Sequence, residues 1–312
     1  MIETNDLSKQ FNNEFWAVDG VNLNVQPGEI LALLGQNGAG KTTTVRMLTA
    51  LLSPTRGWAR VAGYDVIKNP QEIRSNVGVL TEQHGLYMRM TAIEYLEFFG
   101  RVYGLEATTR KSRSDYLLEY FGLAEAARRR TGEYSKGMKQ KLALARSLMH
   151  DPAVLLLDEP TSAMDPESSR LVRDEIARLR SSQRTIIICT HNLAEAEALA
   201  DRIAIIYRGK ILLNGTLDEL KSQVLGPVEY EANFAEAFDA GELDLTPGVE
   251  LVSRSATSLR FRIEAPHVAN PKLVRALTSH HASLVSFHEV PRKLEQVYLK
   301  TMADAQGVAY AA

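Results

Sequence analysis

Short, continuous apolar runs recur along the amino-terminal part of the chain, and helix-like segments follow them. The runs cover residues 30–34, 154–157 and 185–189. Strands that are buried on both faces of a parallel sheet have this pattern, because neither face meets water. Helix-like segments are expected over residues 42–52, 136–150 and 168–179. The alternation of the two patterns predicts an α/β domain.

Two further segments of this part of the chain have different patterns. Residues 1–27 read as short strands separated by turns. Residues 91–130 are helix-rich, with aromatic side chains at helical spacing. Three consecutive arginines at 128–130 close this segment, and we interpret them as a solvated helix end. The pattern therefore predicts a helical insertion, at about 84–150, within the α/β domain.

The composition changes after about Val224, where Gly226-Pro227 marks a break. The elements expected beyond it are an alternating strand at 258–264, a helix that opens at Asn270-Pro271, a strand at 282–290, and a final helix with Leu294, Val297, Tyr298 and Met302 on one face. We therefore predict two domains, an α/β domain over residues 1–222 and a small α+β domain over residues 223–312.

Composition and charge are those of an ordinary globular protein. The chain has 312 residues, of which 45% are hydrophobic and 24% charged, with a formal net charge of −2. This balance gives no general attraction to nucleic acid or to an anionic membrane. We find no signal peptide and no apolar run of the roughly 18 residues that a membrane span needs. If the protein acts at a membrane, we expect another chain to supply the membrane part.

The single cysteine, Cys189, lies in an apolar run and is interpreted as a small buried side chain. One cysteine excludes an internal disulfide framework and fits a reducing cytoplasm.

Residues 35–42 read Gly-Gln-Asn-Gly-Ala-Gly-Lys-Thr, which fits the phosphate-binding P-loop pattern. The loop stands between an apolar strand and a helix, as the pattern requires. Its glycines allow backbone N–H groups to point at phosphate oxygens, and the following helix adds its positive end. We expect Lys41 to reach the β- and γ-phosphates and the Thr42 hydroxyl to hold Mg²⁺. The pattern therefore predicts a nucleoside triphosphate and Mg²⁺, and the family resemblance described below implies that the nucleotide is ATP.

An acidic pair follows a second apolar strand. Asp158 directly ends the run at 154–157, so it is expected near the metal, and Glu159 can polarise a water molecule against the γ-phosphate. His191 follows the run at 185–189 and is expected to reach the γ-phosphate, because ligands bind at the carboxyl ends of parallel strands. Ser135, shortly before Gly137, offers a hydroxyl to an anion or simply caps a helix; both interpretations are compatible.

Taken together, these motifs resemble the nucleotide-binding domain of ABC (ATP-binding cassette) proteins. Residues 35–42 correspond to the Walker A motif of the family, 155–159 to Walker B, 134–138 to the signature motif, 162–165 to the D-loop, and His191 to the switch histidine. The resemblance covers residues 1 to about 222. It implies a P-loop NTPase cassette with a mixed core sheet, an antiparallel β subdomain and a helical insertion. The carboxy-terminal domain is also similar to that of bacterial export ATPases whose membrane subunits are separate chains.

The resemblance also implies a set of site residues. Glu159, His191 and Lys41 are expected to be catalytic, and Thr42 and Asp158 to bind the metal. Phe11 falls where the family has an aromatic that stacks on adenine. The expected nucleotide-binding residues are Phe11, Gly35, Asn37, Gly38, Gly40, Lys41, Thr42, Thr43, Ser135 and Gly137.

Two positions depart from the family pattern. The signature has Lys136 and Met138 where Gly and Gln are usual, but Ser135 and Gly137 remain. In the Q-loop, an ungapped alignment puts Glu82 at the position of the glutamine, with Gln83 beside it. A carboxylate can still bind Mg²⁺ or its water, so both residues stay candidates for the metal site.

The resemblance implies an ATPase that closes head to tail with a second cassette, from an identical or a related chain. We expect it to drive export by integral membrane permease subunits at the cytoplasmic face of the membrane, with the Q-loop and residues 85–91 transmitting the movement. No nucleic acid partner is expected. One alternative is a soluble ABC ATPase that is not coupled to transport, and another is a protein that holds ATP without hydrolysing it. The cargo is left open, since substrate contacts belong to the membrane subunits.

Overall fold

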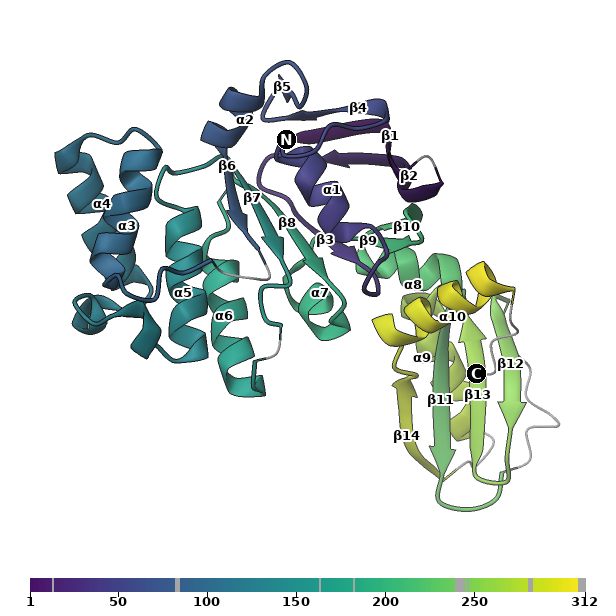
Figure 1. Ribbon diagram of the computed structural model, residues 1–312. Helices are drawn as coiled ribbons and strands as arrows, with labels where there is room; N and C mark the ends of the chain where they lie inside the picture. The colour runs from purple at the N-terminus through teal and green to yellow at the C-terminus, as the bar shows by residue number, and fades with distance from the viewer. Residues whose placement is uncertain are drawn as a thin grey trace. The chain divides into compact units, whose positions relative to one another are not determined.

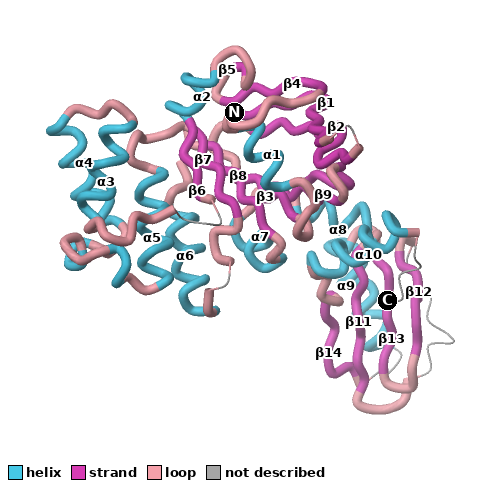
Figure 2. Tube along the Cα trace, viewed as in Figure 1, coloured by secondary structure: helices cyan, strands magenta, loops and turns pink. Residues whose placement is uncertain are grey.

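The computed structural model describes residues 1–12, 14–81, 85–162, 164–181, 183–238, 245, 247–279 and 283–307. The chain divides into two compact units, Met1–Leu217 and Asp218–Ala312. The boundary predicted after residue 222 lies inside helix α8 (Leu217–Leu225), in the second unit. Each unit is described by itself (Figures 1 and 2).

The first unit is organised around a six-stranded mixed sheet. Its strands, in spatial order, are β10 (Lys210–Gly215), β9 (Arg202–Tyr207), β3 (Ile30–Leu34), β8 (Thr185–Thr190), β7 (Val154–Asp158) and β6 (Val77–Leu80). All neighbours pair in parallel except β9 and β10. Strands β3, β8 and β7 are therefore adjacent, and their carboxyl ends meet at one edge of the sheet.

The apolar side chains of these strands enter two separate cores. Leu155 and Leu157 face one core with helices α3 (Ala92–Val102), α4 (Ala107–Tyr120), α5 (Lys136–Ser147) and α6 (Pro166–Arg178). Leu156 faces the other core with α1 (Lys41–Leu48). Because consecutive residues of a strand point to opposite faces, an uninterrupted apolar run is needed to fill both cores. Helix α7 (Leu193–Leu199) follows β8.

An antiparallel sheet covers the second core. Its strands, in spatial order, are β2 (Phe15–Val25), β1 (Ile2–Phe11), β4 (Arg56–Val61) and β5 (Tyr64–Asp65), and α2 (Pro70–Asn76) follows. Phe11 pairs with Phe15 at the tip of the hairpin that β1 and β2 form. The hairpin thus brings two exposed aromatic side chains together.

The predicted helical insertion begins at a capping motif, formed by Thr91 and Glu94. The Thr91 hydroxyl accepts the Glu94 N–H at 3.3 Å, and the Glu94 carboxylate accepts the Thr91 N–H at 2.8 Å, so α3 starts with a capping box. The arginines at 128–130 are exposed, but they do not end an α-helix as expected. They lie between short 3₁₀ turns at Ala124–Ala126 and Thr131–Glu133, and Arg129 pairs with Glu133 at 3.7 Å.

The second unit is a four-stranded antiparallel sheet with helices. Its strands, in spatial order, are β12 (Val249–Arg254), β13 (Ser258–Ile263), β11 (Val228–Phe234) and β14 (Leu284–Glu289). Leu259, Phe261 and Ile263 pack against Leu273 and Leu277 of α9 (Pro266–Ser279). The unit ends with α10 (Leu294–Gln306).

The predicted start of a helix at Asn270-Pro271 is wrong. Helix α9 begins at Pro266, and Pro271 lies inside it. Proline is well tolerated in a first helical turn, which Pro266 occupies, and the apolar spacing through Leu273 and Leu277 outweighs the backbone bond that Pro271 cannot make. None of the helices in the described part of the chain is long and apolar enough to cross a membrane.

Candidate functional site

The loop after β3 requires glycine at two positions. A Cβ atom at Gly35 would lie 2.4 Å from the carbonyl oxygen of Ile206. At Gly40, φ is 113° and a Cβ atom would lie 2.5 Å from the carbonyl oxygen of Ala17. Side chains would therefore push the loop away from strands β2 and β9. The two glycines let it turn tightly into α1, so that backbone N–H groups and the positive helix end face outward.

Lys41, the first residue of α1, is buried although it is charged. Its ammonium donates to the carbonyl oxygens of Gly35 at 2.7 Å and Gln36 at 3.2 Å. It also pairs with Glu159 Oε1 at 3.2 Å. Its position is therefore set by the loop on one side and by a carboxylate from another strand on the other.

Thr42 and Asp158 form the oxygen-rich part of the site. Asp158 ends β7 and is buried, and the Thr42 hydroxyl donates to its Oδ2 at 2.8 Å. Hydroxyl and carboxylate oxygens are hard ligands of the kind that Mg²⁺ prefers, and Mg²⁺ typically takes only one or two carboxylates beside phosphate and water. Among the described residues, no cluster of three or more His, Cys, Asp and Glu side chains could hold a metal by itself.

Glu159 and His191 meet beside Lys41. Glu159 Oε2 lies 2.8 Å from Nδ1 of His191, which follows β8. The Glu159 N–H donates to the carbonyl oxygen of Cys189 at 2.8 Å, which holds the ends of β7 and β8 together. Complete burial raises the pKa of the Cys189 thiol well above its usual value, so this cysteine is an inert core side chain, as the sequence suggested.

A cavity of about 450 Å³ lies elsewhere in this unit, and a second one, of about 370 Å³, opens at the P-loop itself. The side chains and backbone that line the P-loop cavity belong to Phe11, Phe15, Ala17, Gln36, Asn37, Gly38, Gly40, Lys41, Thr42, Thr43 and Glu159. Most of the residues expected to bind nucleotide are thus gathered in one place, where the aromatic residues Phe11 and Phe15 and the residue Lys41 line the same cavity.

Sequence reasoning missed Phe15. Its exposed fraction is 61%, larger than the 40% of Phe11, although both are apolar. The signal was present, because the turn that follows Phe11 predicts a hairpin and places Phe15 directly opposite. Gln36 and Ala17 also line the cavity and were not singled out.

Ser135 and Gly137 do not line this cavity. Ser135 caps α5 by accepting the Met138 N–H at 3.3 Å, and its side chain is exposed. The start of α5 is therefore an exposed helix N-terminus of the same unit. Glu82 and Gln83, the two candidates at the Q-loop position, lie outside the described residues.

The chain matches known proteins over most of its length. The family model described as ABC transporter matches residues 18–162. The chain is 42% identical over 224 residues to the ABC transporter ATP-binding protein NatA of Bacillus subtilis, a match that covers 70% of this chain and 91% of NatA. It is 37% identical over 303 residues to the daunorubicin/doxorubicin resistance ATP-binding protein DrrA of Streptomyces peucetius, covering 96% of this chain and 91% of DrrA.

The fold also has solved counterparts. The dimeric structure of MJ0796, a bacterial ABC transporter cassette, has a TM-score of 0.63 and 25% sequence identity, and the match covers 70% of this chain and 99% of the cassette. The family model extends over Lys41, Asp158 and Glu159 of the P-loop site, and the match to NatA covers more than two thirds of the chain. The chain therefore belongs to the ATP-binding proteins of the ABC transporter family, and it is an ATPase.

Proposed function

We propose that the chain is the ATP-hydrolysing subunit of an exporter whose membrane-spanning subunits are separate proteins. The observation that carries the proposal is the meeting of Lys41, Glu159 and His191, of which Lys41 and Glu159 line the P-loop cavity. A protein that only holds ATP needs the loop but not this carboxylate–histidine pair. The names of the relatives, which are transporter ATP-binding proteins and include a drug-resistance protein, support the direction of transport.

In the proposed reaction, Glu159 accepts a proton as water attacks the γ-phosphate in line. Its carboxylate is held by two groups, Lys41 at 3.2 Å and His191 at 2.8 Å, which define its orientation. Lys41 and His191 then stabilise the negative charge that develops on the transferred phosphoryl oxygens. Mg²⁺ bound to the Thr42 hydroxyl and the Asp158 carboxylate would neutralise charge on the phosphates.

The adenine is proposed to stack on the aromatic end of the cavity, where Phe11 and Phe15 present large exposed ring surfaces. A second cassette, from an identical or related chain, would then cover the nucleotide with Ser135 and Gly137. Two observations support this arrangement. The start of α5 is exposed and lies outside its own P-loop cavity, and the similar cassette MJ0796 is dimeric.

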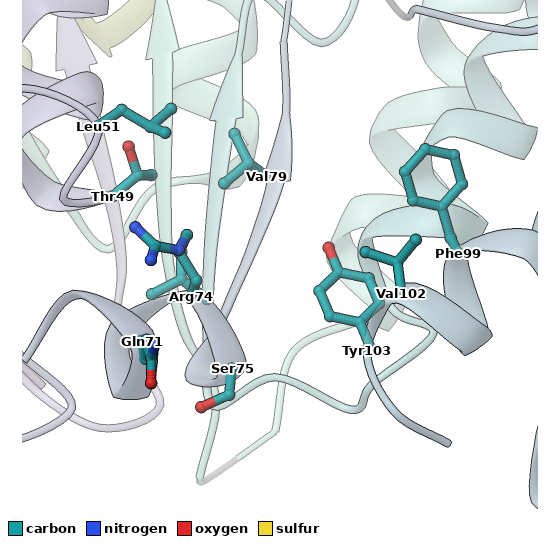
Figure 3. A pocket seen from close by; sticks show the side chains of 10 residues that line it. Thr49, Leu51, Gln71, Arg74, Ser75, Val79, Phe99, Val102 and Tyr103 are labelled. Atoms are coloured by element: carbon teal, nitrogen blue, oxygen red, sulfur yellow. The ribbon is translucent and has the colours of Figure 1, made fainter. Parts of the chain in front are cut away.

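A groove in the first unit supports a membrane partner (Figure 3). It has a volume of about 450 Å³, and Phe99 and Val102 of α3, with Tyr103 directly after the helix, line one side of it. Leu51, after α1, and Arg74, on α2, contribute to the other side. Leu51 and Val102 are both largely exposed. We propose that a short amphipathic helix from the cytoplasmic side of the membrane subunit fills this groove, with an acidic residue near Arg74.

The test is coexpression of the chain with the membrane protein encoded beside its gene. We expect the two to copurify from detergent, and phosphate release to depend on Glu159. The double variant Leu51→Asp, Val102→Asp should lose copurification, because charges would enter the apolar groove. Ile67, an equally exposed apolar residue outside the groove, provides the matched control Ile67→Asp. Copurification that survives in the groove variant would contradict the docking site, and an ATPase that never associates with membranes would favour the uncoupled alternative.

A further inference from the structure

Glu159 is held in a backbone conformation that residues with a Cβ atom rarely adopt. Its φ angle is 51°, and such strained positions persist only where the surrounding structure over-determines them. Backbone bonds supply part of the constraint. The Glu159 N–H donates to Cys189, and the Ser162 N–H donates to the Glu159 carbonyl oxygen at 3.1 Å. The two residues in between, Pro160 and Thr161, are fixed by side chains from other elements.

Two buried polar side chains reach these residues from different helices. The Gln140 amide on α5 donates to the carbonyl oxygen of Pro160. The Thr161 hydroxyl donates to Glu195 Oε1 on α7 at 2.8 Å. The exposed fractions are 2% for Gln140, 6% for Thr161 and 0% for Glu195. Because buried polar groups are costly unless they are hydrogen-bonded, these bonds define the path of the chain just after Glu159 closely.

Glu195 is also connected to the segment that carries His191. Thr190 immediately precedes His191 and is fully buried. On the other side of His191, the Asn192 N–H donates to the Thr190 hydroxyl oxygen at 3.0 Å, and the Asn192 side chain accepts the Glu195 N–H at 3.3 Å. Glu195 therefore links a residue after Glu159 to the residues on both sides of His191.

We propose that Gln140 and Glu195 are positioning residues that hold Glu159 and His191 at the separation needed for hydrolysis. The inference rests on the roles proposed above for Glu159 and His191. The residues that make up this arrangement, here called the Glu195 clamp, are Gln140, Thr161, Thr190 and Glu195. They touch no part of the P-loop cavity, so they act through the groups that do.

The Glu195 clamp also connects the site to the signature helix. Ser135, which is proposed to meet the ATP of the second cassette, caps the start of α5, and the same helix carries Gln140. A shift of α5 along its axis would pull on the Pro160 carbonyl group and so on the strained residue before it. Closure of the two cassettes would in this way reach Glu159 through one rigid helix, without passing through the bound nucleotide.

Conservative variants can separate positioning from simple packing. Burial raises the pKa of the Glu195 carboxyl group, and this group accepts the hydrogen bond of the Thr161 hydroxyl. Glu195→Gln keeps an acceptor for Thr161, whereas Glu195→Ala removes it. Thr161→Val keeps the side-chain shape without the hydroxyl, and Thr161→Ser restores the hydroxyl. Thr161→Val serves as the main test if Glu195→Ala fails to fold.

Phosphate release and calorimetric titration with a non-hydrolysable ATP analogue are measured on the full chain. We expect Glu195→Ala and Thr161→Val to lower kcat about tenfold or more, since small displacements of catalytic groups have large effects on rate. Affinity for the analogue should stay within about twofold, because the lost interaction acts in the transition state. Glu195→Gln and Thr161→Ser should recover most of the rate. Glu197→Ala, an exposed change on the same helix, is the matched control and should leave kcat unchanged.

Combining Thr161→Val with Glu159→Gln gives the decisive comparison. If the clamp acts through Glu159, the double variant is no slower in single turnover than Glu159→Gln alone, because residues that act as a unit are not additive. Multiplied losses, an unchanged kcat in both Thr161→Val and Glu195→Ala, or a parallel fall in affinity would each overturn the proposal. Failure of the proposed function is distinguishable, since it would show as wild-type turnover in Glu159→Gln itself.

Discussion

The two units of this chain use their sheets in opposite ways. Strands β3, β7 and β8 of the first unit are buried at every position. Strand β13 of the second unit alternates between buried and half-buried residues, and two of its half-buried residues, Arg260 and Arg262, are charged. The first pattern leaves room for functional side chains only where a strand ends. The second displays charged side chains along a whole face.

On the charged face of the second unit, the arginine side chains form ion pairs with glutamates of the same face. Arg262 pairs with Glu229 at 3.0 Å and with Glu250 at 3.1 Å, and Arg260 pairs with Glu231 at 3.2 Å, all across neighbouring strands. These groups are partly exposed, so each pair contributes at most about 1 kcal/mol to stability. In the first unit, by contrast, the Lys41 and Glu159 side chains are only 6% and 9% exposed, and both line a cavity. The position of a charged group in a cavity, and not the number of charged groups, therefore indicates a catalytic role in this chain.

The substitution Glu159→Gln is the strongest test of this contrast between the two units. We expect ATP binding to persist and turnover to fall by about a hundredfold or more, because the amide keeps the shape of the side chain but cannot accept a proton from water. The variant should also trap a closed dimer with ATP. The measurements are phosphate release, analogue titration and sedimentation with ATP. Turnover within a few-fold of wild type would remove Glu159 from its role.

Lys41→Ala should affect binding and hydrolysis together. The ammonium is expected to contact phosphate in both the ground and the transition state, and a hydrogen bond to a charged group is worth about 1.5–3 kcal/mol, or roughly tenfold to a hundredfold in affinity. Loss of Lys41 also leaves Glu159 without its 3.2 Å partner. The ATP affinity of the variant is measured by calorimetric titration. An unchanged affinity would contradict the assignment of residues 35–42 as the P-loop.

The sequence predicts the parts of the site that lie where a regular element ends. Lys41, Asp158 and His191 each directly follow an apolar run or a glycine-rich turn, so strand alignment alone brings them to one edge of the sheet. The α/β core and the antiparallel second unit follow from the helical and the strand periodicity of the apolar residues. The strands β9 and β10 were not predicted, although the apolar runs at 203–206 and 211–213 and the turn at 208–209 between them are a hairpin signal.

Residues that act across long sequence separations could not be found in this way. Gln140 meets Pro160, and Thr161 meets Glu195, only because α5 and α7 pack beside the loop after β7. In the sequence, Gln140 and Glu195 are ordinary polar residues of helices. The left-handed backbone at Glu159 is likewise set by contacts that no local pattern encodes.

Phe15 allows a finer test of the cavity. Phe15→Ala should weaken ATP affinity about fivefold or more, because stacking of a base on an aromatic ring is worth about 1–3 kcal/mol. kcat at saturating ATP should change little, since the ring lies far from the reacting phosphate in the proposed arrangement. Trp58→Ala is a suitable control, because Trp58 is an exposed aromatic residue of the same antiparallel sheet outside the cavity. Equal effects of the two substitutions would show that Phe15 does not stack on the base.

The smallest effect on nucleotide handling is expected from removal of the second unit. Its described residues contribute nothing to the P-loop cavity, and we propose that it serves regulation or assembly, by contacting its dimer mate or the membrane subunits. The structure indicates where to cut. Lys300 donates to the carbonyl oxygen of Val224 at 2.8 Å and Arg292 to that of Gly226 at 2.8 Å, so α8 ends inside the second unit. A cut at Val224 would leave α8 without these partners and expose its buried Leu220.

We therefore expect a chain that ends at Leu217 to bind ATP within about twofold of the full chain, because the buried core and the P-loop cavity of the first unit are complete without residues 218–312. Dimer stability or coupling to transport should fall instead. Nucleotide affinity, sedimentation with ATP and transport are compared for the two chains. Arg262→Ala in the full chain is the control for a mere weakening of the second unit. This substitution removes two partly exposed ion pairs and leaves the fold in place. If a folded chain ending at Leu217 loses ATP binding, the second unit contributes to the nucleotide site, and the contrast between a unit that does chemistry and a unit that makes contacts fails.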